Sequence, residues 1–133
     1  MNYCALAILP IAAPIVQATE LPPSVRLAFE TYTALPAQLV PVLKEVQDKA
    51  SASAAAEKLK GRLTCIYEAR EKLHNMPALT SSQNQLVRTR YGQRMREEWA
   101  LMYEQITRLK NNRCYQSAEF AEIFHLMCMM IER

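Results

Sequence analysis

The chain has 133 residues, a formal net charge of +3, two glycines and four cysteines. This length suits one domain with a single core, the charge is too small to indicate nucleic acid or an anionic membrane as partner, and the cysteines are too few for a disulfide scaffold. Ala, Leu, Glu, Lys, Arg, Met and Gln dominate after residue 24 and lose little freedom in a helix, so the composition predicts an all-α protein.

The first 19 residues contain no charged side chain, and an apolar run extends from Cys4 to Val16. Val16 and Ala18 suit the −3 and −1 positions of a signal-peptidase site, where small residues are accepted. We therefore expect residues 1–18 to be a signal peptide and residues 19–133 to form one exported domain. This predicts a periplasmic or secreted protein of bacterial type.

The same segment leaves one alternative open. A signal peptide usually begins with a basic residue, but the first one here is Arg26, so residues 1–18 could instead be retained and pack on the domain. A membrane span is not expected, because the apolar run is shorter than the roughly 20 residues that a bilayer requires. Pro10 and Pro14 also interrupt it. The mature chain therefore contains no predicted transmembrane segment.

Two proline-bounded segments are predicted next. Pro22-Pro23-Ser24 supplies a stop and an N-cap for a short helix that ends at Pro36. A second helical run starts at Pro36, where proline is tolerated in the first turn. Pro41 should kink this run, because proline has no N–H to donate one turn back.

Three long amphipathic helices follow, each with an N-capping signal. Asp48-Lys49-Ala50-Ser51 begins a helix to about Asn75, Thr80-Ser81-Ser82 begins one to about Lys110, and Ser117 caps the last. Their predicted buried faces are Ala52, Ala55, Ala56, Leu59, Leu63, Ile66 and Leu73; Val87, Tyr91, Met95, Trp99, Met102, Ile106 and Leu109; and Phe120, Ile123, Phe124, Met127, Met130 and Ile131. The pattern predicts an antiparallel three- to four-helix bundle with a Pro-kinked first helix.

Residues 48–59, with the sequence DKASASAAAEKL, resemble a segment of small exported helical bacterial proteins that have no assigned activity. The resemblance covers about a tenth of the chain. It implies export and a helical fold, and it transfers no functional residue.

The end of the chain contains soft metal ligands. His125, Cys128 and Met129 project on one side of the last helix, and imidazole, thiolate and thioether groups select copper(I). A copper site is therefore one alternative function. The competing interpretation is structural: methionine fills gaps in cores, and another helix or a partner subunit covers this face.

Removal of Cys4 with the signal peptide leaves an odd number of thiols, Cys65, Cys114 and Cys128. In an antiparallel bundle Cys65 and Cys128 lie within roughly 8 Å of the same axial level, whereas Cys114 lies about 20 Å away. We therefore predict a Cys65–Cys128 disulfide, with Cys114 available for an intermolecular bond.

Arg88, Arg90, Arg94 and Arg96 occur close to Tyr91 and Trp99, a mixture that could bind phosphate or nucleic acid. At 100° per residue, however, the four arginines point in about four directions. The i,i+4 spacing of Arg94 with Glu98, and of Glu104 with Arg108, indicates a solvated face with ion pairs. Nucleic-acid binding is therefore an alternative that we do not expect.

No catalytic motif and no cofactor motif is present, so we expect a protein that is not an enzyme. Leu101, Cys128 and Met129 are apolar residues off the predicted core faces, and we predict them as a partner surface. The sequence thus indicates a small exported helical protein that acts by binding a protein partner or by self-association.

Overall fold

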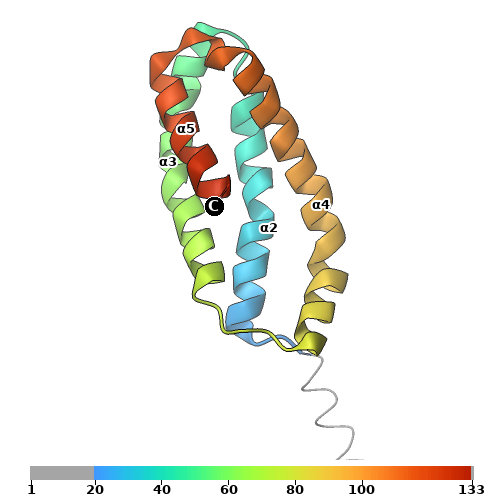
Figure 1. The fold of residues 1–133 in the computed structure, drawn as a ribbon. Coiled ribbons are helices and arrows are strands. Elements are labelled where there is room, and N and C mark those ends of the chain that lie inside the picture. The colour runs from blue at the N-terminus through green and yellow to red at the C-terminus, as the bar shows by residue number, and fades with distance from the viewer. Residues whose placement is uncertain (1–19, 133) are drawn as a thin grey trace, which may run out of the picture.

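The computed structural model describes residues 20–132 as a single bundle of helices (Figure 1). The helices are α2 (Pro23–Lys44), α3 (Lys49–His74), α4 (Ser81–Asn111) and α5 (Ala118–Glu132), and the short turn η1 (Arg113–Gln116) joins the last two. Within these residues there is no strand, so the predicted all-α bundle is confirmed. The predicted signal peptide, residues 1–18, lies outside the described part of the chain.

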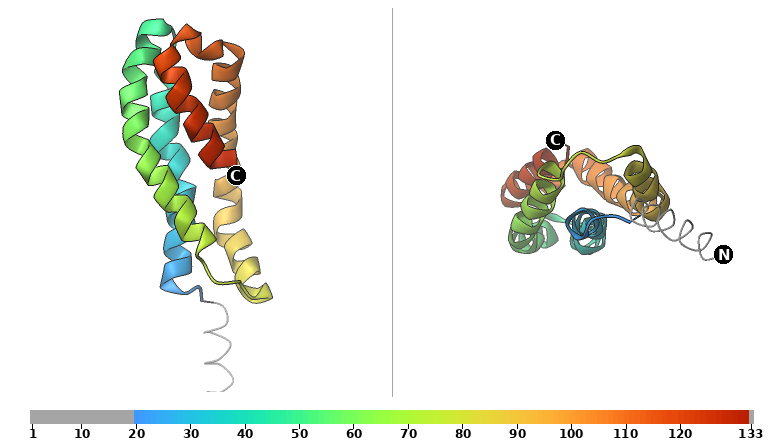
Figure 2. Two further views of the ribbon diagram at one scale, coloured as in Figure 1. Left: turned by 60° about the vertical axis from the view of Figure 1, so that its left-hand side comes forward. Right: turned by 90° about the horizontal axis from the view of Figure 1, so that it is seen from below.

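Helix α2 occupies the middle of the bundle. It packs against α3 on one side and α4 on the other, while α5 packs against α3, as two further views show (Figure 2). Because α5 has 15 residues and α4 has 31, the last helix covers only part of the bundle's length. No helix within residues 20–132 is long and apolar enough to cross a bilayer.

The prediction that Pro36 ends the first helix is wrong. Pro36 and Pro41 both lie inside one continuous 22-residue helix, α2. Each proline removes a helical hydrogen bond. Nine residues of α2 are buried, Pro36 among them, and we attribute the persistence of the helix to its packing between α3 and α4, because tertiary packing supplies most helical stability in proteins.

The predicted starts of α3, α4 and α5 are confirmed, whereas α2 begins at Pro23 without the predicted side-chain N-cap. The Asp48 carboxylate accepts the Ser51 N–H at 2.7 Å, and these hydrogen bonds from Ser51 lower the pKa of Asp48. Thr80 forms the same reciprocal capping box with Gln83 at the start of α4. The Ser117 hydroxyl accepts the Phe120 N–H at the start of α5. Local polar chemistry therefore fixes where α3, α4 and α5 begin.

The core has two parts. The larger part joins all four helices, and Leu39, Leu59, Met102, Leu109 and Phe120 are among its fully buried residues. The smaller part lies at the start of α2, where Leu21 and Val25 pack with Tyr91. The predicted buried face of α4 is confirmed at Tyr91, Trp99, Met102, Ile106 and Leu109, and Val87 and Met95 are half-buried.

Arg108 connects three elements rather than pairing with Glu104 as predicted. Its guanidinium donates to the carbonyl oxygen of Leu43, in the last turn of α2, and to that of Val46, just after the helix, each at 2.8 Å. It also donates to the Tyr115 hydroxyl at 3.0 Å. A charged donor thus bonds to the Val46 carbonyl and adds a partner to the Leu43 carbonyl, which also accepts the Val46 N–H at 3.2 Å.

We predict that Arg108→Ala destabilises the protein by about 2 to 4 kcal/mol, because two partly buried carbonyl groups lose a charged donor. Urea unfolding followed by circular dichroism measures the change. Arg94→Ala is the matched control on the same helix: its ion pair with Glu98 is on the surface, and its loss should cost less than about 1 kcal/mol. Equal losses in the two variants would contradict this role for Arg108.

Candidate functional site

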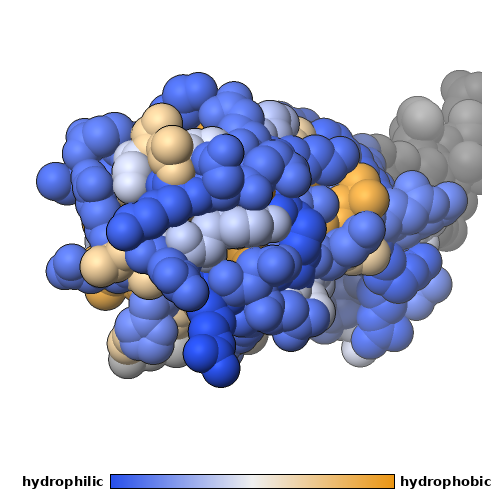
Figure 3. All heavy atoms as spheres, turned by 90° about the horizontal axis from the view of Figure 1, so that it is seen from above, coloured by the Kyte–Doolittle hydropathy of each residue, from blue (hydrophilic) through white to orange (hydrophobic). Residues whose placement is uncertain are grey.

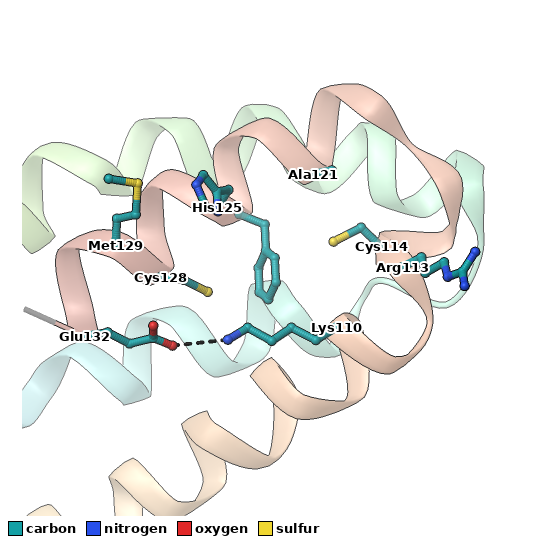
Figure 4. A pocket seen from close by; sticks show the side chains of 9 residues that line it. Lys110, Arg113, Cys114, Ala121, His125, Cys128, Met129 and Glu132 are labelled. Atoms are coloured by element: carbon teal, nitrogen blue, oxygen red, sulfur yellow. Dashed lines mark hydrogen bonds and ion pairs between the residues drawn. The ribbon is translucent and has the colours of Figure 1, made fainter.

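A cavity of about 480 Å³, which we call the α5 cavity, lies between α5, the end of α4 and η1 (Figure 4). His125, Cys128 and Met129, the three predicted soft ligands, all border it. The remaining lining residues are Lys110, Arg113, Cys114, Ala121, Phe124 and Glu132. The structure therefore brings the predicted residues to one place.

The three side chains do not converge there. Cys128 is only 5% exposed and points toward the cavity, whereas His125 and Met129 rise from the exposed side of α5 (Figure 4). Lys110 and Glu132 form an ion pair at 3.2 Å beside Cys128. Among residues 20–132 no group of three or more His, Cys, Asp or Glu side chains is arranged to hold a metal ion.

Cys114 is the cavity residue that sequence reasoning missed. The four residues of η1 all have positive φ, between 52° and 62°, although none is glycine. This left-handed turn is costly for residues with a side chain, so residue type gave no signal for it. It places Cys114 in the interior, with its sulfur toward the same cavity as that of Cys128 (Figure 4).

The predicted Cys65–Cys128 disulfide is not formed, since Cys65, Cys114 and Cys128 are all free thiols. Cys65 is exposed on α3, whereas Cys128 is buried beside the end of α4. Equal axial level was the basis of the prediction, but it does not determine the direction of a side chain. Cys114, predicted to be available for an intermolecular bond, is buried.

Both buried cysteines are held in the thiol form. Burial raises the pKa of Cys128 to about 11, and the negative charge of Glu132 adds to the effect while Lys110 opposes it. Burial also raises the pKa of Cys114. The thiolate is the nucleophile and the metal ligand, so at neutral pH both groups are poor nucleophiles and would have to release a proton to bind a metal.

The four arginines of α4 point in different directions around the helix and do not form one phosphate site. Arg88, Arg90, Arg94 and Arg96 are all exposed, and Arg94 pairs with Glu98 at 3.0 Å as predicted. Tyr91 and Trp99 are buried in the bundle, so neither presents a free ring for stacking on a base.

A second region, which sequence reasoning did not find, lies at the last turn of α5. Two hollows of about 290 and 240 Å³ both border on Arg70 and His74 of α3. Tyr67 and Met130 line the first hollow, and Tyr32 and Ile131 line the second. The Arg70 guanidinium donates to the Met130 carbonyl, and so it caps the end of α5.

A row of aromatic rings extends this region from α3, across Tyr32 of α2, to Trp99 and Tyr103 of α4. Tyr32 stacks on Trp99 with ring centroids 4.9 Å apart, and Trp99 contacts Tyr103 at 5.9 Å. Burial and the nearby Tyr103 raise the pKa of Tyr32, whereas Arg70 acts in the opposite direction. We call the surface formed by Tyr32, Tyr67, Arg70, His74 and Tyr103 the open side of the bundle.

The predicted partner surface of Leu101, Cys128 and Met129 is not one patch. Cys128 is buried, and Leu101 is half exposed but lies about 180° around α4 from Lys110, which faces α5. Met129 is 40% exposed, and the other large exposed apolar or aromatic residues are Leu27, Tyr67, Tyr103 and Leu126. The end of the bundle seen from above is mostly hydrophilic, with small separate apolar areas (Figure 3).

We predict that an alkylating reagent at pH 8 labels Cys65 first, because only this thiol among the three is exposed. Labelling of Cys128 should rise steeply as the pH approaches 11, since the thiolate fraction increases tenfold per unit below the pKa. Peptide mass spectrometry after timed alkylation measures each rate. Fast labelling of Cys128 in the folded protein at pH 8 would contradict this prediction.

Comparison of the chain with known proteins finds no relative. No family model, no curated protein and no solved structure matches it. The resemblance of residues 48–59 to exported helical proteins therefore stays a prediction.

Proposed function

We propose that this chain is a small exported protein without catalytic activity, and that it acts by binding another protein chain through the open side of the bundle. The observation that supports this most directly is the shortness of α5. It ends after 15 residues and leaves α3 and α4 without a fourth helix over the rest of their length. A helix face without a neighbour is a surface on which a partner can bury apolar area.

The composition of the open side suits a protein interface. Tyr67 and Tyr103 are 56% and 47% exposed, and Arg70 and His74 lie between hollows into which side chains can insert. Tyrosine and arginine are enriched in interfaces because they combine apolar contact area with hydrogen-bonding groups. Trp99, the single tryptophan, lies directly below and supplies a spectroscopic signal for binding.

The alternatives have weaker support. A copper(I) site in the α5 cavity would use Cys128 with His125 and Met129, but these side chains point apart and the thiol is protonated at neutral pH. A phosphate or nucleic-acid site at Arg88–Arg96 would lack the exposed aromatic rings that bases stack on. Nucleophilic catalysis would require an activated thiol, whereas burial has the opposite effect on Cys114 and Cys128.

We predict that a benzophenone amino acid in place of Tyr103 forms covalent adducts with a second polypeptide when the protein is irradiated in its host. The same amino acid in place of Leu101 is the matched control, because Leu101 is equally exposed but lies on the other side of α4. Adducts are detected by a mass shift on denaturing gels. Equal yields at the two positions, or none at either, would show that the open side is not the binding surface.

We predict that the protein recovered from its host begins at Thr19, because Ala18 is at the expected cleavage position. N-terminal sequencing of material from each cell fraction measures this. Recovery of the chain with Met1 in the cytoplasmic fraction would contradict export and would leave the proposal of protein binding to be judged by the cross-linking result alone.

A further inference from the structure

We propose that the open side binds a second copy of this chain, in an antiparallel dimer with two-fold symmetry. The outer face of α5, formed by Glu119, Glu122, Leu126 and Met129, would lie on the open side of the other copy. This inference rests on the proposed function, since it names the partner of the same surface.

The shape of the bundle supports a reciprocal arrangement. Helix α5 stands over one part of the bundle, and the open side begins where α5 ends, at Met130 and Ile131. A two-fold axis near that point, perpendicular to the helices, places each α5 on the open side of the other copy. Both contacts are then identical, as a closed two-fold dimer requires.

The outer face of α5 combines acidic and apolar groups. Glu119, Glu122, Leu126 and Met129 follow one another at spacings of three and four residues, so they form one stripe on the helix. All four are exposed, and Leu126 and Met129 are each 40% exposed. The apolar pair lies toward the end of α5, next to the proposed axis, and the acidic pair lies farther from it.

The outer face of α5 would be received by the open side together with the part of α4 that continues it, and this surface is basic and aromatic. On a helical wheel at 100° per residue, Arg88, Arg96, Trp99, Tyr103 and Lys110 share one side of α4, and Lys110 identifies it as the side toward α5. The carboxylates of α4, at Glu97, Glu98 and Glu104, all lie on the other side. From α3 the region adds Arg70 and His74, together with Glu71.

The positions of the charged groups along α4 and α5 agree with this arrangement. Lys110 pairs with Glu132, and Tyr32, which stacks on Trp99, lines the same hollow as Ile131, so α5 ends at a level between Trp99 and Lys110. At 1.5 Å per residue, Glu122 and Glu119 lie about 14 and 18 Å from Ile131, and Arg96 and Arg88 lie about 13 and 25 Å in the opposite direction from the midpoint between Trp99 and Lys110. A two-fold rotation therefore brings the acidic end of α5 between Arg96 and Arg88, and Leu126 and Met129 to the stretch from Trp99 to Tyr103.

The test uses two charge-reversed variants of the protein as purified from its host: Glu119→Arg with Glu122→Arg, and Arg88→Glu with Arg96→Glu. Each variant alone would place like charges in both contacts of the dimer, and we expect the dissociation constant to rise roughly tenfold or more. An equal mixture of the two pairs opposite charges in both contacts, so dimers should return. Sedimentation velocity at micromolar concentration measures the fraction of dimer in each variant and in the mixture.

A matched control reverses Glu97 and Glu104 to Arg, on the side of α4 away from α5, and should leave the dimer unchanged. Circular dichroism checks that each variant is folded, and the recovery of dimers on mixing would not occur between unfolded chains. A wild-type protein that stays monomeric throughout the micromolar range overturns the dimer, as does a mixture that stays monomeric. If cross-links at position 103 then join the chain to a different polypeptide, the open side still binds protein and only the second copy is wrong.

Discussion

The burial of α2 between α3 and α4 is the constraint on which the rest of this structure depends. Helix α4 packs mainly against α2. The Arg108 guanidinium fixes the end of α2 by bonding to the carbonyl of Leu43, in its last turn, and to that of Val46, just after it. The same guanidinium reaches Tyr115 in η1. One side chain of α4 therefore positions both the end of the central helix and the turn that leads into α5.

The course of α5 follows from that turn. Four consecutive residues with positive φ reverse the chain within η1, bury Cys114 and direct α5 onto α3. Because α5 then ends far short of the length of α3 and α4, the bundle has four helices in one part and three in the other. The open side is the consequence, and its two hollows begin where α5 ends, at Met130 and Ile131.

The chemistry of the two regions differs in a way that bears on function. The sulfur atoms in the α5 cavity are buried and protonated, which suits an inert part of a core better than a reactive site. The open side, by contrast, presents tyrosines, Arg70 and His74 to solvent beside hollows the size of side chains. These are groups that recognise another surface by contact, without any need for a shifted protonation state.

The sequence by itself determined the all-α class, the starts of α3, α4 and α5, and most of the buried residues of each. These features depend on capping groups and on periodicity within one helix, which are local. Only the tertiary structure decided that Pro36 stays helical, that Arg108 bonds to α2 instead of Glu104, that Cys114 approaches the region of Cys128, and that Leu101 and Met129 lie apart. Each of these depends on which neighbour a side chain meets, and spacing along one helix contains no information about the neighbour.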